Sequence, residues 1–130
     1  MATILIADDV DMVRRFIRRI VEDMGHTPVE AENGEVAWIR FQKQPIDLCV
    51  VDVKMPEMDG VSFLRKAKSL DPNAVVIMVT GFPSADTITE TIEEDAYTYV
   101  TKPLKVDQMR DLIERGLEYR KAQIEKGGAI

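Results

Sequence analysis

The sequence predicts an α/β protein built around a parallel sheet, and three observations lead to this fold class. Short, continuous apolar runs occur at residues 4–7, 48–51 and 75–79. Runs of this kind are typical of strands that are buried on both faces. Stretches with helical spacing of apolar residues separate them. Strand-like and helix-like segments alternate five times along the 130 residues, which is the pattern of a βα-repeated domain.

The first half of the chain opens with the strand at residues 4–7, which leads into an amphipathic helix. Asp11 is placed to cap the start of this helix and Gly25 to end it. A second strand is expected at residues 27–30 and a second helix at residues 34–43. The apolar stripe of the first helix consists of Val13, Phe16, Ile17, Ile20, Val21 and Met24.

The second half repeats the strand–helix pattern three times. The strand at residues 48–51 is followed by a turn-rich loop at 54–60 and a third helix. The strand at 75–79 precedes a largely polar helix, and a short strand at 99–101 precedes the last helix, which starts at about residue 105. The apolar positions expected to face the core are Phe63, Leu64, Ala67 and Leu70, then Ala85, Ile88 and Ile92, then Val106, Met109, Ile113 and Leu117.

Length and composition indicate one acidic domain. We assign it to residues 1–121, with 122–130 as the end of the last helix or the start of a linker, frayed at Gly127-Gly128. The net charge of −6 argues against direct nucleic-acid binding. Cys49 is the only cysteine, so no internal disulfide can form. Neither a signal peptide nor a membrane-spanning run is visible, and a cytoplasmic protein is expected.

Polar side chains follow the predicted strands at the points where they end. Asp8 and Asp9 follow the first strand, Asp52 the third and Thr80 the fourth, and Lys102 follows the fifth. In an open α/β sheet the carboxyl ends of the strands meet at one edge, where ligands bind. Three carboxylates crowded there repel each other unless a cation lies among them. The arrangement therefore predicts a site for Mg²⁺ and for an anion such as phosphate.

Four motifs, in order and each at a predicted strand end, make residues 2–120 resemble a response-regulator receiver domain, the phosphoacceptor half of two-component signalling. They are Ile4-Leu5-Ile6-Ala7-Asp8-Asp9, the loop that runs from Asp52 to Gly60, Val79-Thr80-Gly81, and Tyr99-Val100-Thr101-Lys102-Pro103. The resemblance implies a flavodoxin-like fold, a five-stranded parallel sheet of order 2-1-3-4-5 with helices on both faces.

The resemblance also implies a role for each acid. Asp52 matches the aspartate that accepts a phosphoryl group from a histidine kinase. Asp9 resembles the direct Mg²⁺ ligand and Asp8 the neighbour that acts through a metal-bound water, with Asp52 itself a further ligand. Lys54 stands where a backbone carbonyl completes the metal site.

The remaining motif residues resemble the parts that bind the phosphoryl group and switch the protein. Thr80 and Lys102 match the hydroxyl and the amine that contact the phosphoryl oxygens. Tyr99 matches an aromatic residue whose rotamer accompanies activation, and Pro103 follows a peptide bond that is usually cis in this family. Asp95 stands where many receivers have glycine.

The function implied is that of a signalling domain rather than an enzyme. Asp52 would be phosphorylated with Mg²⁺ by a sensor histidine kinase, and the face of the fourth helix, fifth strand and fifth helix would then bind an output domain, an effector protein or a second copy of the chain. The alternative is an aspartyl-phosphate phosphotransferase of the haloacid-dehalogenase type. That family has acids two residues apart on the first strand, whereas Asp8 and Asp9 are adjacent. A stand-alone regulator and a piece of a longer one both remain open.

Overall fold

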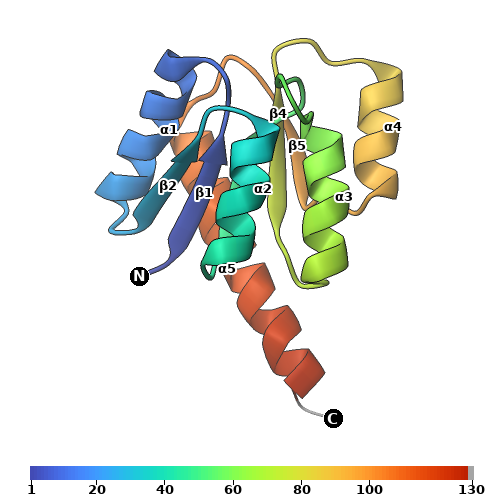
Figure 1. The fold of residues 1–130 in the computed structure, drawn as a ribbon. Helices are drawn as coiled ribbons and strands as arrows, with labels where there is room; N and C mark the ends of the chain where they lie inside the picture. Colours follow the sequence, from blue (N-terminus) through green and yellow to red (C-terminus); the bar gives the residue numbers. More distant parts are fainter. Residues whose placement is uncertain (129–130) are drawn as a thin grey trace.

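A computed structural model describes residues 1–128 and shows one parallel sheet between two layers of helices (Figure 1). The strands lie in the order β2-β1-β3-β4-β5, so the predicted fold class is confirmed. The elements are β1 (Thr3–Ala7), α1 (Asp11–Asp23), β2 (Thr27–Ala31), α2 (Gly34–Lys43), β3 (Leu48–Asp52), α3 (Gly60–Leu70), β4 (Val76–Thr80), α4 (Ala85–Glu93), β5 (Thr98–Thr101) and α5 (Val106–Gly128).

The strand register brings the polar strand ends together. Ala7 pairs with Val51, Asp52 with Val79, and Thr80 with Thr101. Because all five strands are parallel, the residues that follow β1, β3, β4 and β5 emerge at the same edge of the sheet.

Two hydrophobic cores hold the helices against the sheet. Under α1 and α5, side chains such as Ile17, Met109 and Ile113 pack on the sheet, and under α2 and α3 the largest fully buried side chain is Phe63. Every residue of β3 and β4 is buried. The continuous apolar runs are therefore explained, because a strand covered on both faces has no solvent-facing alternation.

Helix α1 differs from the prediction in two details. Its N-cap is Val10, which offers no side-chain cap, and Asp11 is the first helical residue. Asp11 instead lies in the first turn of the helix, where a negative charge is favourable, and pairs with Arg14 and Arg15. Phe16, at the margin of the apolar stripe, is 37% exposed. Gly25 ends the helix with φ +83°, as expected of a C-terminal glycine.

Helix α4 packs more loosely than its sequence predicts. Only Thr91 is buried, while Ile92, expected in the apolar stripe, is 70% exposed. Leu70 at the end of α3 is also exposed, contrary to prediction. Two ion pairs tie α3 to the turn after α4, Arg65–Glu94 at 3.2 Å and Lys68–Asp95 at 3.3 Å. Both involve exposed groups and hold the helix weakly.

Helix α5 continues well beyond the sheet (Figure 1). Of the segment assigned to a helix end or linker, residues 122–128 are helical, including Gly127 and Gly128, which were expected to fray. Residues 129–130 lie outside the described part of the chain. Among residues 1–128, no helix combines the length and apolarity that crossing a membrane requires.

We predict that Asp95→Gly stabilises the fold. Asp95 has φ +65°, a conformation that glycine adopts without steric cost. Its ion pair with Lys68 is largely solvent-exposed, so the relief of strain should win by about 0.5–1 kcal/mol. Urea unfolding measures the change. Asp95→Ala is the control, because it removes the same ion pair and keeps the strain; equal stabilisation by both variants would contradict the explanation.

Candidate metal and phosphoryl site

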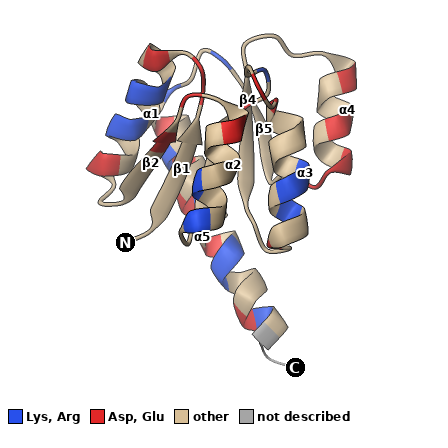
Figure 2. Ribbon diagram, in the orientation of Figure 1, with Lys and Arg blue, Asp and Glu red and all other residues tan. Residues whose placement is uncertain are grey.

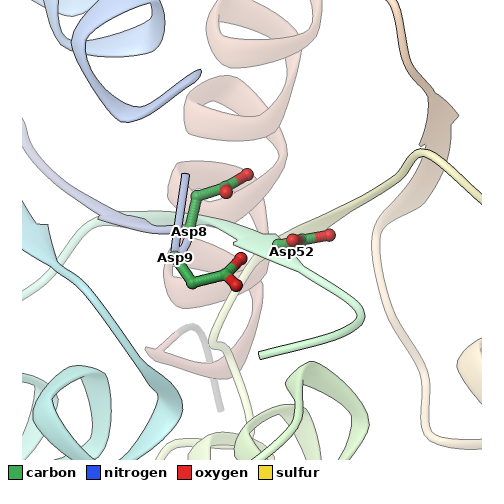
Figure 3. A group of neighbouring side chains, drawn as sticks. All are labelled: Asp8, Asp9 and Asp52. Carbon is green, nitrogen blue, oxygen red and sulfur yellow. The ribbon is translucent and has the colours of Figure 1, made fainter. Parts of the chain in front are cut away.

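The acids predicted from the strand ends form one cluster. Asp8, Asp9 and Asp52 each offer a carboxylate oxygen, and these three oxygens lie within 4.8 Å of one another. Figure 3 shows the three side chains gathered where β1 and β3 end. Asp8 and Asp52 are buried, whereas Asp9 is exposed.

Hydrogen bonds at the end of β1 hold Asp8. Its N–H donates to the Ala31 carbonyl at 3.2 Å, and its Oδ1 accepts from the Val10 N–H at 2.8 Å. The other carboxylate oxygen, Oδ2, is buried without a hydrogen bond. Lys102 Nζ lies 3.1 Å from it, close enough for an ion pair but outside hydrogen-bond geometry.

The loop after β3 folds back against Asp52. The Gly60 N–H donates to the Val53 carbonyl at 2.8 Å, and a Cβ on Gly60 would lie 2.2 Å from the Asp52 carbonyl oxygen. Only glycine fits so close to the backbone. Asp59 then caps α3 by accepting from the Ser62 N–H. Asp52 is thereby held at the end of a rigid strand.

The amine and the hydroxyl come from β5 and β4. Lys102 Nζ lies 3.6 Å from Asp52 Oδ2, and its backbone N–H donates to the Thr80 carbonyl at 2.7 Å. The Lys102–Pro103 peptide bond is cis, as the resemblance implied. Thr80 is buried, and its hydroxyl accepts from the Phe82 N–H at 3.1 Å.

These groups line an open cavity of about 300 Å³. Its walls are Asp9, Val10, Asp52, Lys54, Thr80, Gly81, Phe82 and Lys102. The ammonium of Lys54 lies 5.8 Å from the centre of the Phe82 ring, and both residues line the cavity. Larger hollows of about 480 and 570 Å³ lie beside α5 and between α2 and α3. The acidic cluster borders neither of them, so we take the smaller cavity as the functional one.

The charges of the cluster act on Asp52. Burial is the largest cause that raises the pKa of Asp52 from 3.8 to about 6, and the negative charge of Asp8 is the next. Asp9 raises this pKa further, while Lys102 and a hydrogen bond from the Lys54 backbone lower it. At Asp52, burial and the neighbouring acids thus outweigh the positive charge of Lys102.

The donor set fits a hard divalent cation. All three side chains offer carboxylate oxygens, the ligands that Mg²⁺ prefers, and Asp8 Oδ2 is a buried acceptor without a hydrogen bond. When bound, such an ion neutralises negative charge and orients phosphoryl oxygens.

The structure brings most of the predicted site residues together, but Tyr99 lies apart from them. Tyr99 is not among the residues lining the cavity: it packs on the core beneath α2 and α3, with its hydroxyl buried and without a hydrogen bond. Arg14 lies outside the apolar stripe of α1 that the sequence predicts, yet its guanidinium donates to the Asp8 carbonyl. Its spacing of three residues from Asp11 is a sequence signal for their ion pair, but not for the bond to the Asp8 carbonyl.

An open parallel sheet with acids, a hydroxyl and an amine at its carboxyl edge defines an α/β domain whose candidate ligand site lies at that edge. The family model of the response regulator receiver domain matches residues 4–114, and the chain belongs to this family. It is thus a receiver domain of two-component signalling, a signalling domain.

Individual relatives differ in length. The chain is 34% identical over 114 residues to the sporulation initiation phosphotransferase F of Bacillus subtilis, covering 88% of this chain and 92% of that protein. It is 33% identical to the regulatory protein AtoC of Escherichia coli, again over 88% of this chain but only 25% of AtoC. The crystal structure of a CheY-like receiver domain protein from Methanospirillum hungatei superposes with a TM-score of 0.91, at 26% identity, covering 95% of this chain and 98% of that one.

The raised pKa of Asp52 predicts a pH-dependent effect of Asp52→Asn in metal-free protein. The pKa of Asp52 is higher in the folded protein than in the unfolded chain. Its contribution to folding stability is therefore fully present below pH 3.8 and is lost as the pH rises through about 6. Above pH 6 the ionised Asp52 destabilises the fold, and the neutral amide removes that cost. We expect Asp52→Asn to gain about 1–2 kcal/mol at pH 7.5 after allowance for solvent screening, less as the pH falls.

Urea unfolding with a chelator present, at several pH values, measures this difference. Glu118→Gln, at an exposed position of α5, is the control and should show no such trend. A gain for Asp52→Asn that does not change with pH would contradict the electrostatic explanation.

Proposed function

We propose that Asp52 accepts a phosphoryl group from the phosphohistidine of a sensor histidine kinase. The bond from phosphorus to the imidazole nitrogen breaks, the nitrogen keeps the electron pair, and a bond forms from phosphorus to Asp52 Oδ. The observation that carries this proposal is the position of Asp52, a carboxylate at the end of β3 beside both an amine and two further acids.

Mg²⁺ is the cofactor we infer for this transfer. Asp9 and Asp52 would bind the ion directly, Asp8 through a water molecule, and the Lys54 backbone carbonyl would complete the protein ligands. The buried Asp8 Oδ2, which forms an ion pair but no hydrogen bond, supports this set, since a metal-bound water would donate a hydrogen bond to it.

Lys102 and Thr80 would bind the phosphoryl oxygens. Lys102 already lies within ion-pair distance of Asp8 and Asp52, so its ammonium can move to an added anionic oxygen without leaving the site. The Thr80 hydroxyl accepts from the Phe82 N–H, which leaves its own hydrogen free to be donated. Both groups would stabilise the acyl phosphate by charge-assisted hydrogen bonds.

The same arrangement disfavours the phosphotransferase alternative. Haloacid-dehalogenase enzymes have their two acids two residues apart on one strand, whereas here the proposed acceptor lies on β3 and the adjacent pair Asp8-Asp9 follows β1. Small phosphate esters would test the alternative, because an enzyme turns over many equivalents and a receiver does not.

The first test of the proposal is stoichiometric labelling. With acetyl phosphate and Mg²⁺, we expect intact-mass spectrometry to detect one added phosphoryl group per chain in the wild-type protein and none in Asp52→Asn. Asp59→Asn is the matched control: it removes a nearby carboxylate outside the cavity and keeps an amide that caps α3 well. Labelling of Asp52→Asn equal to that of the control would refute the assignment.

We further propose that phosphorylation changes the face formed by α4, β5 and α5. Thr80 would move toward the phosphoryl oxygens and open a space beneath its side chain, and Tyr99 would turn inward into that space. Two observations support this switch. The Tyr99 hydroxyl is buried without a partner, so its present position is not strongly preferred, and α4 contributes only one buried side chain.

The switching face combines exposed apolar and acidic groups. Phe82, Ile92 and Val106 are exposed apolar side chains on or beside it, and Figure 2 shows acidic residues along α4. An output domain, an effector protein or a second copy of the chain could bind there. A partner that prefers one state tenfold would contribute about 1.4 kcal/mol to the switch.

Hydrogen exchange tests the switch. With Mg²⁺ and beryllofluoride, a mimic of the phosphoryl group, we expect altered exchange across residues 82–110 in the wild-type protein. Asp52→Asn under the same conditions should show no change, which separates the effect from unspecific fluoride binding. If the changes stay in the loops around Asp52, the proposed switch is wrong.

A further inference from the structure

One arginine of α1 connects three parts of the structure near the acidic cluster. The guanidinium of Arg14 donates to the Asp8 carbonyl at 2.8 Å, to Asp11 Oδ1 at 2.7 Å and to Glu30 Oε1 at 3.2 Å. Its side chain is only 14% exposed. Three acceptors from the end of β1, the start of α1 and the end of β2 thus share one rigid, planar group.

The bond to the Asp8 carbonyl bears directly on Asp9. This carbonyl belongs to the peptide group that joins Asp8 to Asp9, so its direction sets the path of the chain into Asp9. Because the Asp9 side chain is exposed, its direction depends on the backbone conformation more than on packing against neighbouring side chains. Arg14 therefore acts where the direction of the acid pair is determined.

Arg14 is itself held in place from β2. Glu30 pairs with Arg14 through Oε1 and with Arg18 through Oε2, the latter at 2.6 Å. Its neighbour Ala31 accepts the Asp8 N–H. Glu30 and Ala31 thus connect β2 to the peptide groups before and after Asp8: Ala31 binds the Asp8 N–H directly, and Glu30 reaches the Asp8 carbonyl through Arg14.

We propose that Arg14 is a positioning residue of the metal site: it holds the Asp8–Asp9 peptide so that both carboxylates face the ion. This inference rests on the proposed Mg²⁺ site. Arg14 contacts no phosphoryl group or ion in the proposal and acts only through the acids.

The sign of the effect separates positioning from simple charge. Arg14 is a cation near a cation site, so by Coulomb's law its removal would strengthen Mg²⁺ binding. Positioning predicts the opposite. Substitutions of residues that orient metal ligands typically weaken metal binding about 10- to 100-fold.

Arg15 provides the matched control. It lies one residue away, carries the same charge and pairs with Asp11 Oδ2 at 3.0 Å, but its side chain is 75% exposed and it makes no bond to the Asp8 carbonyl among the described residues. Arg15→Ala therefore removes a similar charge without releasing the peptide.

The experiment is a calorimetric Mg²⁺ titration of the wild-type protein and four variants. We expect about tenfold weaker binding in Arg14→Ala. Arg14→Lys should be intermediate, because one ammonium cannot reach all three acceptors. Glu30→Gln, which keeps Arg14 but loosens its anchor, should weaken binding less than Arg14→Ala. Arg15→Ala should bind unchanged or slightly more tightly.

A metal-free readout accompanies the titration. In Arg14→Ala, the Val10 amide, which donates to Asp8 Oδ1, should exchange its hydrogen faster, whereas in Arg15→Ala it should not. Urea unfolding establishes that each variant is folded. If Arg14→Ala does not fold, Arg14→Lys and Glu30→Gln test the positioning role in its place.

The outcomes distinguish the inference from the function on which it rests. If the wild-type protein binds Mg²⁺ and the Arg14 and Glu30 variants bind it as tightly or more tightly, the positioning role is refuted and the metal site stands. If the wild-type protein does not bind Mg²⁺, the metal site fails, and this role for Arg14 fails with it.

Discussion

The repulsion among three carboxylates at one edge of the sheet is the interaction on which the rest of this structure depends. One carboxylate oxygen from each lies within 4.8 Å of the other two. Lys102, which lines the cavity, lies within ion-pair distance of Asp8 and Asp52. A flexible loop would relieve such crowding by moving its acids apart. Here buried parallel strands and hydrogen bonds to Asp8 oppose that movement, so the unfavourable charge is retained. In the proposed function, a cation and a phosphoryl group would make use of it.

In the proposed switch, differences in packing would explain how the charge cluster influences the surface of α4, β5 and α5. Thr80 lies at the cluster and at the end of β4, directly before the segment that leads into α4. That helix has one buried side chain and is tied to α3 by exposed ion pairs, so moving it costs little. The strands that carry the acids have no comparable freedom, because each is packed on both faces. A local change in charge would therefore move the loosely held element.

Patterns along the chain were sufficient for the fold class and for the acidic cluster, because both follow from rules of parallel sheets, whereas the strand order was implied by the resemblance to receiver domains. Continuous apolar runs indicated the buried strands, and parallel strand ends must share an edge. Periodicity was less reliable at the margins of a helix face, as Phe16, Leu70 and Ile92 show by their exposure. Arg14 could not be placed from sequence, since its acceptors include a backbone carbonyl of the β1–α1 loop and a carboxylate on β2. Such contacts depend on tertiary structure and leave no periodic signal.

The proposed output face joins a loosely held helix to a firmly held one. Helix α5 packs on the sheet through Met109 and Ile113, and at Gly116 it approaches Leu48 so closely that a Cβ would lie 2.5 Å from the leucine. A partner that contacts both α4 and α5 could use α5 as a constant docking surface and detect only the position of α4. Its affinity for the two states would then differ through the α4 contacts alone, and a difference of about 1–2 kcal/mol in those contacts is enough for a switch.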